Sequence, residues 1–110
     1  MIIKSTVDAG NCLQVKLSGS LDLAGVEAVE MDFAALLAGE QHLLIDLTEV
    51  DFIASMGIRM LLSGAKQLNR RDLKLVLAAP NECVKEALEI TNINSIIPVF
   101  DTIDQAETAL

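Results

Sequence analysis

The alternation of strand-like and helix-like segments restricts the fold more than any other feature of this sequence. Apolar and polar residues alternate over residues 12–18, and short apolar runs follow at 42–47, 73–78 and 96–100. Between these runs, apolar residues recur at helical spacing in segments that begin near Asp22, Ser55 and Pro80. Strands that alternate with helices form a mostly parallel sheet with right-handed crossovers. The sequence therefore predicts an α/β protein.

The two ends of the chain complete the predicted order ββαβαβαβα. Residues 2–7 form a weaker strand, and the Gly10-Asn11 pair after it is typical of a hairpin, so an antiparallel edge strand is expected. Gly19 to Asp22 should break the second strand, with Asp22 or a near neighbour as the N-cap of the first helix. Thr102 and Gln105 have capping-box spacing for a terminal helix. Continued winding in one direction would place the helices mainly on one face of the sheet.

Length and composition exclude several classes of protein. The 110 residues correspond to one domain, residues 1–110. The formal net charge of −8 opposes direct binding to nucleic acid, and no apolar run approaches the roughly 20 residues that span a bilayer. Cys12 and Cys83 lie far apart and His42 is the single histidine, so no metal or cofactor is expected. We expect a cytoplasmic monomer whose partners are proteins.

No catalytic motif stands out. The chain has no G-x-S-x-G elbow, no P-loop and no G-x-G-x-x-G motif, and His42 has no nucleophile paired with it. The protein is therefore not expected to be an enzyme.

The most informative stretch runs from Leu44 to Leu62. A buried strand ends, a loop over residues 48–51 follows, and Phe52 and Ile53 are expected to anchor that loop to the core. Ser55 then falls at a helix start, where a serine commonly caps the helix and contributes about 1 kcal/mol. Gly57 in the first turn costs about 1 kcal/mol relative to alanine. Close approach by another molecule is one explanation for that glycine.

This stretch resembles the signature of the STAS domain, the fold of bacterial anti-sigma factor antagonists. Residues 52–58, Phe-Ile-Ala-Ser-Met-Gly-Ile, occupy the frame of the family's central motif. Residues 17–22 resemble its Leu-x-Gly-x-Leu-Asp segment, and Pro80 with Val84 and Leu88 resembles its third helix. The resemblance covers essentially the whole chain. Ala54 and Met56 depart from it, because the best-known antagonists have Asp and Ser or Thr at these places.

The resemblance implies partner switching. Ser55 lies where the family's phosphorylated serine lies. The unphosphorylated domain would bind an anti-sigma factor that is also a serine kinase and so free a sigma factor, and a metal-dependent serine phosphatase would reset it. The expected partner-binding residues are Asp22, Ala54, Ser55, Met56, Gly57, Arg59, Met60 and Ser63. The alternative is an accessory subunit of a membrane transporter of lipids or anions, which phosphorylation does not switch.

Several of these residues also have simpler interpretations. Asp22 can be a plain helix cap, part of the partner surface, or both. Met56, Met60 and Ser63 lie on the face opposite the core stripe, where methionine is adaptable contact material or merely scattered surface. Arg59 lies one turn after Ser55, within reach of a phosphate. A cluster of basic residues either meets an acidic partner or forms a solvated face: Arg59, Lys66, Arg70, Arg71 and Lys74.

Overall fold

The computed structural model describes residues 2–7 and 12–110, and it has the predicted α/β order. In chain order the elements are β1 (Ile2–Val7), β2 (Cys12–Leu21), α1 (Leu23–Leu37), β3 (His42–Ile53), α2 (Ser55–Asn69), β4 (Leu75–Ala78), α3 (Glu82–Ile90), a 3₁₀ turn η1 (Ile93–Ser95), β5 (Val99–Phe100) and α4 (Ile103–Thr108). The hairpin predicted at Gly10-Asn11 lies outside the described residues.

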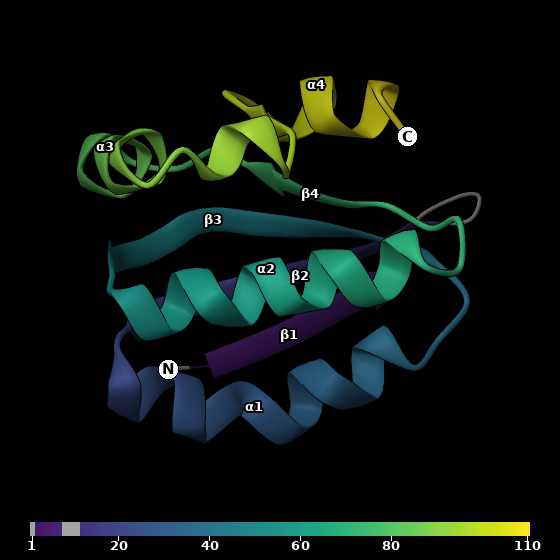
Figure 1. Ribbon diagram of the computed structural model, residues 1–110, viewed down its shortest axis with the longest axis horizontal. Coiled ribbons are helices and arrows are strands. Elements are labelled where there is room, and N and C mark those ends of the chain that lie inside the picture. Colours follow the sequence, from purple (N-terminus) through teal and green to yellow (C-terminus); the bar gives the residue numbers. More distant parts are fainter. Residues whose placement is uncertain (1, 8–11) are drawn as a thin grey trace.

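The sheet confirms the predicted topology. Its strand order is β1-β2-β3-β4-β5, with β1 antiparallel to β2 and every other neighbouring pair parallel. The carboxyl ends of β2, β3 and β4 therefore meet at one edge of the sheet. Helices α1, α2 and α3 begin from that edge, which lies on the left in Figure 1.

The helices lie mainly on one face, as expected. Successive side chains of a strand point to opposite faces of the sheet. Leu43 and Ile45 of β3 point to the same face, where they belong to the larger core that also contains residues of α1, α2 and α3. Leu44 between them points to the other face. There it packs in a smaller cluster with Val76 of β4 and Ala106 of α4. Three helices thus cover one face of the sheet and α4 covers part of the other.

Strands β2 and β3 are longer than predicted. Gly19 to Leu21 continues β2, and residues 48–51 belong to β3, so the expected strand break and the expected loop are both wrong. The two strands stay paired through register shifts between Lys16 and Ser18 and between Gly19 and Ser20, where Gly19 adopts a φ of 112°. A bulge locally disrupts the alternation of apolar and polar residues. The sequence pattern therefore does not show that the two strands continue beyond it.

The helix starts agree with the predictions in part. The Asp22 side chain caps α1, and Thr102 caps α4 by accepting a hydrogen bond from the Gln105 N–H at 3.1 Å. Pro80 does not open the third helix, because the cap is Asn81, whose side chain accepts from the Val84 N–H at 2.8 Å. The last two strands are also shorter than predicted.

Candidate functional site

The turns that follow β2 and β3 lie side by side. The Ala54 N–H donates to the Leu21 carbonyl at 3.0 Å, which joins the end of β2 to the start of α2. Asp22 follows Leu21 directly, and its carboxylate accepts from the Gly25 N–H at 2.8 Å. The structure therefore brings Asp22, Ala54 and Ser55 together at one edge of the sheet. Asp22 is a helix cap, and it adjoins the turn that carries Ser55.

Helix α2 begins without a side-chain cap. Its N-cap is Ala54, and Ser55 is the first helical residue, so the interpretation of Ser55 as an ordinary N-cap is wrong. The physical reason is the Ala54–Leu21 hydrogen bond, which holds Ala54 in an extended conformation one residue before the serine. Ser55 is exposed, and its hydroxyl makes no hydrogen bond within residues 2–7 and 12–110. The first-turn N–H groups and the positive end of the helix dipole lie beside it.

Gly57 is required by this chain itself. It is buried, and an added Cβ would lie 2.6 Å from Leu21 Cγ and 2.7 Å from the Leu21 carbonyl oxygen. Close approach by another molecule is therefore not needed to explain the glycine. Its burial also removes Gly57 from the surface expected to contact a partner. The residue instead lets the first turn of α2 pack against the end of β2.

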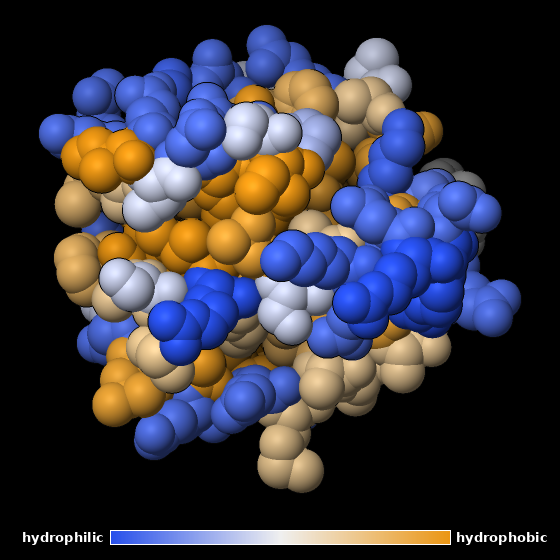
Figure 2. Space-filling model, viewed as in Figure 1, coloured by the Kyte–Doolittle hydropathy of each residue, from blue (hydrophilic) through white to orange (hydrophobic). Residues whose placement is uncertain are grey.

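Three apolar side chains near Ser55 are exposed. Phe52 is 47% exposed, Met56 is 39% exposed and Leu23 is 55% exposed. Phe52 does not anchor to the core as expected, although Ile53 does. Figure 2 shows apolar surface at the left edge of the molecule, where the first helices begin. Sequence analysis missed Leu23 and Phe52. Leu23 is an apolar residue that does not share the helical spacing of the buried residues of α1, and this pattern could have indicated that it is exposed.

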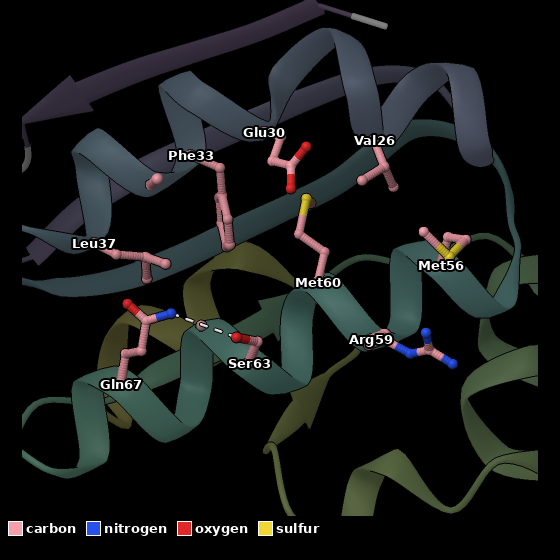
Figure 3. Close-up of a pocket in the computed structure, with 11 residues that line it drawn as sticks. Val26, Glu30, Phe33, Leu37, Met56, Arg59, Met60, Ser63 and Gln67 are labelled. Atoms are coloured by element: carbon pink, nitrogen blue, oxygen red, sulfur yellow. Dashed lines mark hydrogen bonds between the residues drawn. The ribbon is translucent and has the colours of Figure 1, made fainter.

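A groove of about 290 Å³ separates α1 from α2 (Figure 3). The predicted outer set, Met56, Met60 and Ser63, lines it together with residues of α1. Met60 is half-buried, not exposed as expected, because its side chain points between the two helices. The three residues thus form one continuous lining that begins next to Ser55.

The basic cluster does not form one free face. Arg71 donates to the Gly39 carbonyl at 3.0 Å and to the Leu37 carbonyl, so it holds the C-terminal end of α1. Arg59 and Lys66 are exposed on α2. Of this basic cluster, Arg59 is the residue near Ser55, one helical turn further along α2.

Shifted pKa values occur away from this edge. Hydrogen bonds from Lys16 and then Ser18 hold the pKa of Glu49 below its ordinary value, and hydrogen bonding to Glu49 raises the pKa of Lys16.

Within the described ranges, no group of three His, Cys, Asp or Glu side chains could hold a metal ion. No helix in the same ranges is long and apolar enough to cross a membrane. The site thus offers an exposed hydroxyl, an open helix start and an apolar surround.

Known proteins are similar to this chain in sequence and in fold. Residues 4–106 match the STAS domain family. BtrV of Bordetella bronchiseptica, named as a candidate anti-sigma factor antagonist, is 36% identical over 94 residues, covering 84% of this chain and 81% of that protein.

Two solved structures extend the comparison. An anti-sigma factor antagonist from Mycobacterium paratuberculosis has a TM-score of 0.87 and 25% identity, covering 98% of this chain and 93% of that one. The Bacillus protein SpoIIAA in its phosphorylated form has a TM-score of 0.72 and 14% identity, covering 98% of each chain. This chain therefore belongs to the STAS domain family, and its relatives include proteins named as anti-sigma factor antagonists.

Proposed function

We propose that this protein is a cytoplasmic anti-sigma factor antagonist that is controlled by phosphorylation of Ser55. The unphosphorylated chain binds an anti-sigma factor that is also a serine kinase, and this binding frees a sigma factor. The kinase transfers the γ-phosphoryl group of ATP to the Ser55 hydroxyl oxygen, and ADP and the hydroxyl proton leave. A metal-dependent serine phosphatase later hydrolyses the phosphoserine with water, which restores the hydroxyl and releases phosphate. The chain itself acts as a phosphate acceptor and not as an enzyme.

One observation carries this proposal. The Ser55 hydroxyl is exposed at the start of α2, where the N-cap Ala54 contributes no side-chain hydrogen bond. A phosphate there would add about −1.5 to −2 charges beside free N–H groups and the positive end of the helix dipole. Arg59 lies one turn further along the helix, at a spacing from which it can approach the phosphate. The folded domain should therefore tolerate the modification.

A bound partner should not tolerate it. Leu23, Phe52 and Met56 offer an apolar surround in which a partner would bury Ser55 from water. Arg59 can offset at most one of the two charges of the phosphate, and burying the remaining charge unpaired costs several kcal/mol. Phosphorylation would thus release the partner without unfolding this domain. The remaining members of the proposed binding surface are Asp22, Ala54, Arg59, Met60 and Ser63.

The test is a pull-down from source cells, with bound proteins identified by mass spectrometry. The baits are the wild type, Ser55→Asp, and the matched control Ser5→Asp, which places the same charge at an exposed position on β1. We expect wild type and Ser5→Asp to recover a serine kinase, and Ser55→Asp to recover roughly 100-fold less. Equal recovery by all three baits would contradict the switch. Equal recovery of transporter subunits would instead support the accessory-subunit role.

A further inference from the structure

The groove between α1 and α2 has the length of a short helix. It runs beside residues 26–37 of α1 and residues 56–67 of α2, about 16 Å of each helix at 1.5 Å per residue. Phe33, Val26 and Met60 point into it in Figure 3. Gly64 brings the helices close at its floor, because an added Cβ there would lie 3.0 Å from the Phe33 ring. The floor is therefore apolar along its length.

The two walls of this groove carry opposite charge. Every charged residue of α1 is acidic, and every charged residue of α2 is basic. Glu30 lines the groove from α1 and Arg59 lines it from α2. Neither takes part in the two ion pairs found in the described parts of the chain, Lys16–Glu49 and Lys85–Asp101. An apolar floor thus lies between an acidic wall and a basic wall.

We propose that this groove binds an amphipathic helix of a partner protein. About three turns of helix would place apolar side chains at i, i+3 or i+4 and i+7 on the floor. Basic side chains of that helix would face Glu30 and acidic ones would face Arg59. A helix fits better than an extended strand, because it satisfies its own backbone hydrogen bonds and the groove walls offer no free strand edge. Met56 and Met60 can adapt to the side chains of the incoming helix.

The groove continues directly from the phosphorylation site. Met56 lines the groove and follows Ser55 in the chain. The helix therefore belongs to the protein that covers Ser55. This assignment rests on the proposed function, whereas the binding of such a helix to the groove does not. The groove would give the partner a contact region in addition to the apolar surround of Ser55.

The test is an NMR titration of the complete unphosphorylated chain with a synthetic peptide of about four helical turns. The peptide carries an apolar stripe with lysines on one flank and glutamates on the other, and a peptide of scrambled order is the control. We expect saturable shifts at groove residues with the designed peptide alone. Ala34 and Ala35 are both exposed on α1, but Ala34 lines the groove. Ala34→Glu should weaken binding at least tenfold, whereas Ala35→Glu should leave it unchanged.

Three results would overturn the proposal. The first is that the chemical shifts do not saturate at about millimolar peptide. The second is that the shifted residues lie outside the groove. The third is that Ala34→Glu and Ala35→Glu weaken peptide binding equally. The titration does not involve modification of Ser55, so its failure leaves the phosphorylation switch standing. Conversely, a pull-down in which Ser55→Asp behaves like wild type leaves the groove result standing.

Discussion

Replacing Gly57 by alanine tests how the start of α2 is positioned. The added Cβ would lie 2.6 Å from Leu21 Cγ, 2.7 Å from the Leu21 carbonyl oxygen and 2.9 Å from Leu21 Cδ2. The side-chain atoms can shift, but the carbonyl oxygen is held because it accepts the Ala54 N–H at 3.0 Å. The first turn of the helix must therefore move away from β2 or accept the strain.

The magnitude follows from two opposing effects. Overpacking in a tightly packed interior costs about 1–3 kcal/mol, and alanine in a helix is favoured over glycine by about 1 kcal/mol. Because the added Cβ clashes with a fixed backbone atom, we expect an overpacking cost at the upper end of its range. We expect Gly57→Ala to lower the free energy of unfolding by about 1–2 kcal/mol. For a domain of this size that corresponds to a fall in melting temperature of about 4–8 °C.

The assay is urea and thermal unfolding followed by circular dichroism. Gly39→Ala is the matched control, because the nearest atom to its added Cβ is the Leu36 carbonyl oxygen at 3.4 Å, an ordinary contact. The control should stay within about 0.5 kcal/mol of the wild type. A Gly57→Ala variant as stable as the wild type would refute the role of Leu21. If that variant also bound its partner more weakly, a close approach by the partner would explain the glycine instead.

Two further predictions concern a helix cap and a surface ion pair. Asp22→Ala removes the acceptor of the Gly25 N–H and should lower the free energy of unfolding by about 1 kcal/mol, whereas Asp22→Asn should stay near wild type in the same urea titration. The folded pKa of Glu49 lies below its ordinary value of 4.5, so its stabilisation is present above that value and is lost as pH falls through the folded pKa. Glu49→Gln should therefore lower the unfolding free energy at neutral pH but hardly at about pH 2, and an equal loss at both pH values would contradict this.

The sequence by itself determined the order and the type of the elements. Period-two and helical patterns arise from local geometry and burial, so they identified the alternating strands and helices and the parallel sheet. The caps Asp22 and Thr102 were also predicted, because a capping side chain bonds to a backbone N–H within its own first turn. The placement of Ser55 at the start of α2 followed from the same local pattern.

Only the tertiary structure decided the features that depend on distant residues. Strands β2 and β3 continue past the predicted ends because they pair with each other through bulges. Ser55 is free of a capping role because Ala54 bonds to Leu21, and Gly57 is small because Leu21 lies against it. The opposite charges of the groove walls belong to α1 and α2, which only the packing of the helices on the sheet brings side by side. A periodic pattern reports which face of an element is buried, but it does not report which other element it meets.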